Sequence, residues 1–200
     1  MMVVLASFIW GWHGSFPGSG LLVVVFYFGL GALRHARRRE TPALLGLGFN
    51  NGRAAFRNVS GVVLPAAILV LATGAMLDSW HFPPWQRLFV ALPWMLIWAT
   101  VQQYGLLCFF YRGFLEILER PAAATAAAAT TFAGFHAPNG FLMAVTLCAG
   151  ILACALYHRS QNVIAIGIAH AALSFLLLFS LPVDVTHGLR VGPDYFAAVR

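Results

Sequence analysis

Two histidines lie inside apolar stretches, His136 in FAGFHAPNGF and His170 in IGIAHAALSF. An ionisable side chain is costly within a membrane, so it usually faces the protein interior and takes part in function. A neutral imidazole can act as a base. Ser174 follows His170 by one helical turn on the same face, where it could steady the imidazole or only pack. The two histidines are therefore the first candidates for a site.

The composition predicts that a membrane surrounds these residues. Hydrophobic residues make up 60% of the 200 residues and charged residues only 9%, whereas a soluble domain carries about 25% charged residues. The net charge is +6, and all 12 basic residues are arginines. Cationic cytoplasmic loops explain this excess better than nucleic-acid binding does. We therefore expect an all-α, polytopic membrane bundle with lipid neighbours and no nucleic-acid partner.

Apolar segments that reach or approach the length of a membrane span predict six or seven spans. The candidates are residues 21–33, 60–77, 87–111, 121–136, 141–156 and 162–181. The N-terminal MMVVLASFIWGW is short for a span and lacks the basic start of a signal peptide. It either lies at the interface or is preceded by a missing start.

The chain divides into three expected regions. N-terminal membrane helices and a basic loop occupy residues 1–84, a membrane core with the candidate site occupies 85–182, and a polar tail occupies 183–200. If the RHARRRE loop is cytoplasmic, nine arginines fall on that side and three on the other. This bias predicts an external C-terminus, with anionic lipid beside the RHARRR run.

Glutamines are the other polar candidates, because no acidic residue lies in the middle of a predicted span. Gln102 and Gln103 are either interhelical hydrogen-bonding residues or members of a site. At 1.5 Å per residue, Gln103 lies about 13 Å and His170 about 12 Å from the cytoplasmic end, so they could share a level. The same count puts His136 deeper, at about 22 Å.

The motifs around the histidines resemble those of the CAAX protease and bacteriocin-processing (CPBP) intramembrane proteases. FAGFH fits the family's FxxxH motif at Phe132 and His136, followed by Pro138–Asn139. HAALS fits the HxxxN motif, with Ser174 in place of asparagine. The resemblance covers roughly residues 85–180. It implies an endopeptidase that cleaves membrane-anchored proteins or peptides. Together with the arginine bias, it implies a bacterial inner membrane.

The family's first motif, a glutamate pair usually written EExxxR, is missing. One alignment sets Gln102–Gln103 on the glutamates, and the other sets Leu107–Cys108 there, followed by Arg112. The second glutamate usually lies a little over thirty residues before the FxxxH histidine. Gln103 lies 33 residues before His136, and Cys108 lies 28 before it. The spacing therefore favours the glutamine alignment.

The missing carboxylates bear directly on activity. In the family a glutamate is thought to take a proton from the attacking water, while the histidines hold the water and stabilise the oxyanion. A glutamine amide cannot act as a base, so a water held by Gln103 and activated by His170 would be a poor catalyst. The chain is thus either an endopeptidase or an inactive homologue that acts as a membrane scaffold or immunity protein.

The resemblance assigns roles to seven residues. The catalytic candidates are Gln102, Gln103, His136, His170 and Ser174. Phe132 and Asn139 are candidates for substrate binding, although the proline before Asn139 favours a turn residue there.

Cofactors and other membrane mechanisms have little support. The three cysteines, Cys108, Cys148 and Cys154, lie in apolar runs without metal-type spacing, so no disulfide, metal or cofactor is expected. A zinc site from His136, His170 and Cys108 is not required by the spacing. The GSG at residues 18–20 lies in a loop, which argues against a rhomboid-type serine protease. The paired broken helices of a transporter are also missing.

Overall fold

The computed structural model describes residue 9 and residues 19–198, which form helices and connections without a strand. The predicted all-α bundle is confirmed. The long helices are α2 (Ser19–Arg37), α3 (Gly52–Met76), α4 (Trp85–Tyr104), α6 (Pro121–Gly134), α7 (Gly140–Ser160) and α8 (Val163–Ser180). The shorter elements are a π-helix η2 (Gly105–Tyr111), α5 (Arg112–Leu118), α9 (Val183–Thr186), a 3-10 turn η3 (His187–Leu189) and α10 (Pro193–Ala198). The MMVVLASFIWGW segment, except Ile9, lies outside the described residues.

Three helices within the described residues, α3, α7 and α8, are long and apolar enough to cross a membrane. On α3, the apolar side chains of Leu64, Ile68 and Leu69 are 60–68% exposed, as expected for a surface that faces lipid. The protein is therefore an integral membrane protein. The larger count of six or seven spans stays a prediction.

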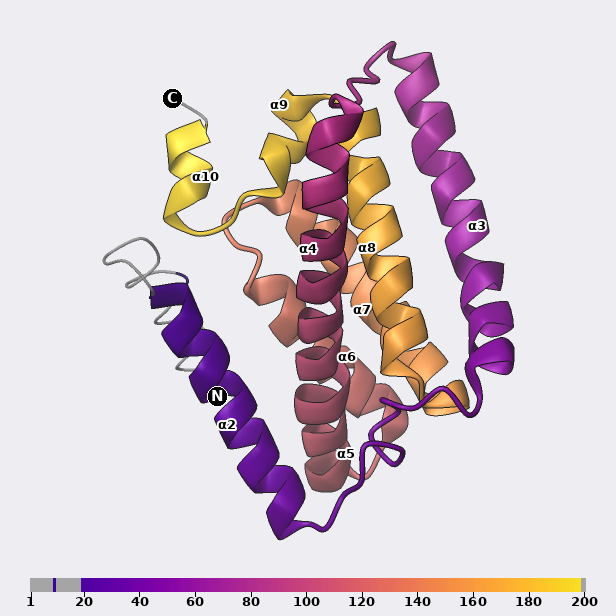
Figure 1. Cartoon of the computed structure of the whole chain (residues 1–200), viewed down its shortest axis with the longest axis vertical. Helices are drawn as coiled ribbons and strands as arrows, with labels where there is room; N and C mark the ends of the chain where they lie inside the picture. The colour runs from indigo at the N-terminus through magenta and orange to yellow at the C-terminus, as the bar shows by residue number, and fades with distance from the viewer. Residues whose placement is uncertain (1–8, 10–18, 199–200) are drawn as a thin grey trace.

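Nine arginines are expected on the cytoplasmic side. The helix ends that carry them lie at the same end of the bundle, which is drawn lowest in Figure 1. Ion pairs join different helices there, with Glu116 of α5 accepting from Arg34 and Arg38. Glu40, in the connection after α2, accepts from Arg112. We refer to this part of the molecule as the basic end.

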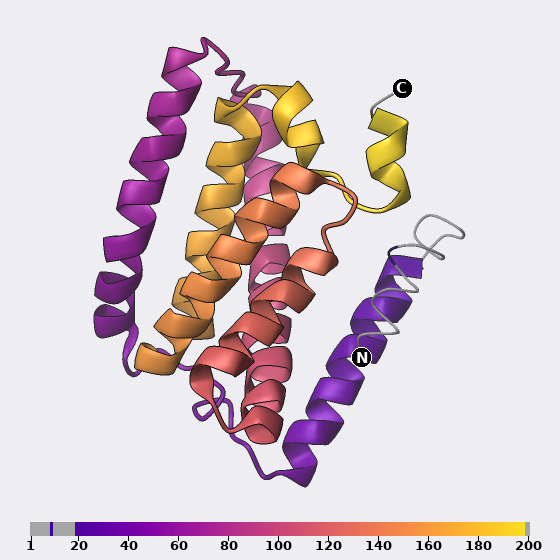
Figure 2. The same ribbon diagram turned by 180° about the vertical axis from the view of Figure 1, so that it is seen from behind.

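A continuous helical rod runs from α4 through η2 to α5 and forms one side of the bundle core (Figure 2). Its middle seven residues, Gly105–Tyr111, have the wider turns of a π-helix. Helix α2 packs across this rod, where a Cβ added at Gly31 would lie 2.6 Å from the hydroxyl of Tyr104. π-helical turns are rare and often mark functional sites. This one begins two residues after Gln103.

Helices α4 and α8 run antiparallel and lie side by side (Figure 1, Figure 2). The two helices come close together at Thr100 and Gly167, where a side chain on Gly167 would overlap Thr100. The Cα–Cβ bonds of a helix tilt toward its N-terminus. In this antiparallel pair, Gln103 and His170 therefore lean toward each other from either side of the contact.

The predicted polar tail, residues 183–200, folds back onto the bundle over its described part. Thr186 of α9 is fully buried. The backbone nitrogen of Gly192 donates to the carbonyl oxygen of Ala137 at 2.9 Å, in the connection between α6 and α7. The described part of the tail therefore packs against the segment that follows His136.

Candidate functional site

Gln103 and His170 form a direct side-chain contact between α4 and α8. The amide nitrogen of Gln103 lies 2.8 Å from Nδ1 of His170, and Gln103 is only 3% exposed. An amide nitrogen can only donate, so Nδ1 of His170 accepts the hydrogen bond. In a neutral imidazole the proton then resides on Nε2. His170 therefore presents an N–H donor on the side of the ring away from Gln103.

His136 has the opposite arrangement. Its Nδ1 lies 2.7 Å from the backbone carbonyl oxygen of Phe132, one helical turn earlier. A carbonyl oxygen can only accept, so Nδ1 carries the proton and Nε2 carries the lone pair. Among the described residues, no hydrogen bond engages that nitrogen. His136 therefore presents an acceptor where His170 presents a donor.

The ring of Phe132 connects the two imidazoles. Its centroid lies 4.8 Å from the ring of His136 and 6.2 Å from the ring of His170, with nearly perpendicular planes in both cases. Phe132 is 6% exposed, so this aromatic contact is buried. The FxxxH spacing allows it, because residues four apart lie on one helix face.

Two buried acceptors lie on α4. The side-chain oxygens of Gln102 and Gln103 are buried and have no hydrogen-bond partner among the described residues. An unmet buried acceptor costs about 1–3 kcal/mol, so a donor that reached either oxygen would bind favourably. Gln103 thus offers both a donor, used on His170, and a free acceptor.

Two other candidates do not join this group. Ser174 is half-buried on α8, and no hydrogen bond from it is found in the described part of the chain. Asn139 is fully buried, and its side-chain oxygen accepts from the backbone nitrogen of Leu142 at the start of α7. Its side-chain nitrogen donates to the carbonyl oxygens of Thr186 and Arg190. The amide of Asn139 is thus occupied in holding α7 and the tail together.

The alternative alignment of the first motif leads to a different region. Cys108 is fully buried, and its sulfur donates to the carbonyl oxygen of Leu45 at 3.4 Å. The hydroxyl of Tyr157 donates to the same carbonyl at 3.1 Å. Arg112 donates to the carbonyl oxygen of Leu44 and to Glu40. These residues fasten the connection after α2 to the bundle, and within the described part of the chain no hydrogen bond joins them to either site histidine.

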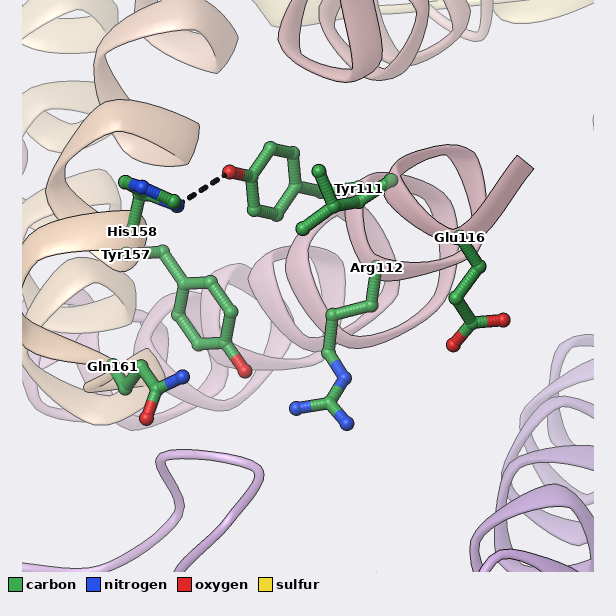
Figure 3. Close-up of a pocket in the computed structure, with 7 residues that line it drawn as sticks. Tyr111, Arg112, Glu116, Tyr157, His158 and Gln161 are labelled. Carbon is green, nitrogen blue, oxygen red and sulfur yellow. Dashed lines mark hydrogen bonds between the residues drawn. The ribbon is translucent and has the colours of Figure 1, made fainter. Parts of the chain in front are cut away.

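A pocket at the basic end was not predicted from the sequence. It has a volume of about 340 Å³ and is lined by Tyr111, Arg112, Leu115, Glu116, Tyr157, His158 and Gln161. Figure 3 shows the hydroxyl of Tyr111 bonded to Nδ1 of His158, at 3.0 Å. The lining comes from segments far apart in the sequence, so spacing alone could not reveal it.

In the described part of the chain, no cluster of three or more His, Cys, Asp or Glu side chains could hold a metal ion.

Comparison with protein families gives one match. The family model for type II CAAX prenyl endopeptidase Rce1-like proteins matches residues 106–176. The matched segment contains Phe132, His136, His170 and Ser174, and it begins after Gln103. No curated protein and no solved structure matches the chain. With the helical membrane fold and the two histidine motifs, this match over residues 106–176 supports a CAAX protease (CPBP) family assignment.

Proposed function

We propose that the protein is an intramembrane endopeptidase of the CAAX protease type, which cleaves a membrane-anchored protein or peptide. The observation that carries this proposal is that two imidazoles packed against one phenyl ring are opposite tautomers, with the proton on Nδ1 in His136 and on Nε2 in His170. His136 offers a lone pair on Nε2, and His170 offers an N–H on Nε2. Peptide hydrolysis needs both a base for water and a donor for the oxyanion.

The reaction that follows from this assignment needs no carboxylate. Nε2 of His136 takes a proton from water as the water oxygen attacks the peptide carbonyl carbon. Nε2–H of His170 donates to the carbonyl oxygen as it becomes negative. The proton on His136 then passes to the leaving nitrogen when the carbon–nitrogen bond breaks. Without a carboxylate to stabilise the imidazolium, we expect slow turnover.

Gln103 acts as a positioning residue in this scheme. Its amide N–H holds Nδ1 of His170 as an acceptor and so keeps the proton on Nε2. The free oxygen of Gln103 is an acceptor for water or for a substrate N–H. Gln102 and Ser174 remain candidate members of the site, and Asn139 a candidate beside the substrate. We further propose that the basic end faces the cytoplasm of a bacterial cell.

A second function is an inactive homologue that holds a peptide as a scaffold or immunity protein. The observation that favours it is that, among the described residues, neither site imidazole hydrogen-bonds a carboxylate. In this case the same groups bind a peptide amide without cleaving it. The two functions predict the same contacts with substrate and differ only in turnover.

A cleavage assay with matched histidine variants tests the proposal. The full chain is placed in liposomes with a membrane-anchored peptide that carries a fluorophore and a quencher. His136→Gln keeps hydrogen bonding but removes the base, so product formation should fall at least about a hundredfold. His81→Gln, in an exposed loop where the imidazole hydrogen-bonds the carbonyl oxygen of Ser79 and contacts the ring of Phe179, is the control and should keep full activity.

The outcomes separate the two functions. Cleavage that survives both His136→Gln and His170→Ala in purified, folded samples would refute the site. If the wild-type chain retains the peptide but releases no product, the scaffold function is supported instead. Retention must then be lost in His170→Ala, because this function uses the same contacts.

A further inference from the structure

A second concave surface lies where the end of α2 meets η2. It has a volume of about 450 Å³. One part of its lining is apolar, from Leu30, Leu33 and Phe109, and the other part is cationic, from Arg34, Arg37 and Arg38. We call this surface the α2 groove. It lies at the basic end, between the last turns of α2 and the π-helix η2.

The cationic part of the α2 groove is only partly neutralised. Arg34 and Arg38 share one carboxylate oxygen of Glu116. Arg37 is exposed and makes no ion pair with any described residue. Three guanidinium groups therefore share the carboxylate of Glu116, while Glu40, which also acts on Arg38, is ion-paired with Arg112. The groove keeps a positive charge that attracts an anion.

Arg34 is held in place by more than its ion pair. It donates to the backbone carbonyl oxygen of Phe109 at 3.2 Å, and its guanidinium carbon lies 5.0 Å from the centre of the Phe109 ring. A fixed guanidinium loses little freedom when it binds a phosphate. Arg37, without such contacts, is free to close onto the same ligand.

The order of these residues along α2 matches the order of groups in a lipid. Leu30 and Leu33 belong to the apolar run that should lie in the hydrocarbon, and the arginines follow at its end. A ligand that fills the groove therefore needs an acyl chain next to an anionic group. We propose that the α2 groove binds an anionic phospholipid, with its phosphate at Arg34 and Arg37 and the start of one acyl chain against Leu33 and Phe109.

Lipid binding by the purified full-length chain tests this site. The chain in detergent is titrated with dioleoylphosphatidylglycerol, dioleoylphosphatidylcholine or inorganic phosphate, and bound lipid is counted by native mass spectrometry. Arg37→Gln removes a charge that makes no ion pair with any described residue, so the fold should persist. Arg57→Gln is the matched control, because Arg57 is exposed on α3 at the same end of the bundle.

Loss of one arginine near a membrane surface is worth about a fivefold change in binding. We expect Arg37→Gln to weaken phosphatidylglycerol binding by about that factor, with Arg57→Gln unchanged. Phosphatidylcholine should bind more weakly, and inorganic phosphate should not displace the lipid. Leu33→Asn, on a half-exposed apolar position, should also weaken lipid binding.

Three results would overturn the proposal. Equal losses in Arg37→Gln and Arg57→Gln would mean that total charge alone attracts the lipid. Displacement of the lipid by inorganic phosphate would mean a free-anion site. Equal binding of the two phospholipids would mean that the arginines do not select an anion.

Discussion

Gly167 of α8 lies directly against Thr100 of α4. A Cβ placed on Gly167 would lie 2.6 Å from Oγ1 and 2.9 Å from Cα of Thr100. Only a residue without a side chain allows the two helix backbones to come this close. Gln103 and His170 each lie three residues further along their chains, and their side chains bridge the same helix pair. The glycine is therefore a structural requirement of the candidate site.

Gly167→Ala should separate α4 from α8 and lengthen the hydrogen bond between Gln103 and His170. Overpacking of this kind costs about 1–3 kcal/mol, so the thermal midpoint of the purified chain should fall. Gly61→Ala is the matched control, because a Cβ at Gly61 on α3 has no atom within 4 Å. That variant should be neutral or slightly stabilising. Equal effects in the two variants would contradict the close contact.

Gln103→Glu should increase peptide cleavage by at least about tenfold. A carboxylate can only accept, so Nδ1 of His170 would have to donate to it and Nε2 would gain the lone pair. This converts His170 from the oxyanion donor into a base that a carboxylate orients and stabilises. Once His170 has taken the proton from the attacking water, its Nε2–H again donates to the oxyanion. The liposome cleavage assay measures the gain. Gln103→Ala, which offers neither group, should show no increase, and a gain in both variants would refute this account.

Asn139→Ala should loosen the tail and destabilise α7 together. The substitution removes the helix cap, worth about 1 kcal/mol, and leaves the carbonyl oxygens of Thr186 and Arg190 without their donor. Asn139→Asp keeps the cap oxygen but loses the donor. We expect limited proteolysis within residues 183–198 in both variants, and a larger fall in thermal midpoint for Asn139→Ala. A tail that stays protected in both would contradict this role.

Acid should release the connection after α2. Burial tends to raise the pKa of Glu40, but hydrogen bonds from His35 and Arg112 outweigh it and hold the pKa below its usual value. The hydrogen bond from Arg38 is the main reason that the pKa of Glu116 is also lowered. As pH falls, the two carboxylates take up protons in the unfolded chain before they do so in the folded chain. Their ion pairs therefore stabilise the fold fully above about pH 4.3, and this stabilisation is lost as the pH falls through the lower pKa values of the folded state.

The pH dependence is measured by thermal unfolding between about pH 7 and about pH 3. The thermal midpoint of the wild-type chain should fall at the acid end, and Glu40→Gln should reduce that fall. Glu119→Gln is the control, because Glu119 is exposed and forms no ion pair in the described part of the chain. If Glu119→Gln reduced the fall in thermal midpoint as much as Glu40→Gln does, the effect would come from total charge and not from the ion pair of Glu40.

Local pattern was enough to predict the last two membrane helices. Apolar runs at 141–156 and 162–181 correspond to α7 and α8, and Asn139 and Asn162 cap their N-termini. The similar depths estimated for Gln103 and His170 also agree with the structure, since the two side chains form a hydrogen bond. The start of α3 was less predictable. Its first turns carry Arg53 and Arg57 and extend beyond the apolar run, which begins at residue 60.

Features that depend on distant segments could not be predicted. The sequence suggested that Asn139 either turns the chain or binds substrate, and its actual partners include backbone groups 47 and 51 residues away. Cys108 and Tyr157 both donate to the carbonyl oxygen of Leu45, and the sequence does not indicate this contact because the three residues lie far apart in the chain. The contact between Thr100 and Gly167 likewise depends on how two helices cross.

The π-helix at Gly105–Tyr111 begins just after Gln102–Gln103 and contains Leu107–Cys108, the two stretches that compete for the first motif. Each residue of a regular helix turns the chain by about 100°, so a single-codon deletion here would rotate Gln103 relative to Arg112 by roughly that angle. Selection acting on insertions and deletions could therefore exchange the side chain that meets His170 without altering either histidine. Members of the lineage that differ by one residue in this segment would carry different chemistry on one scaffold.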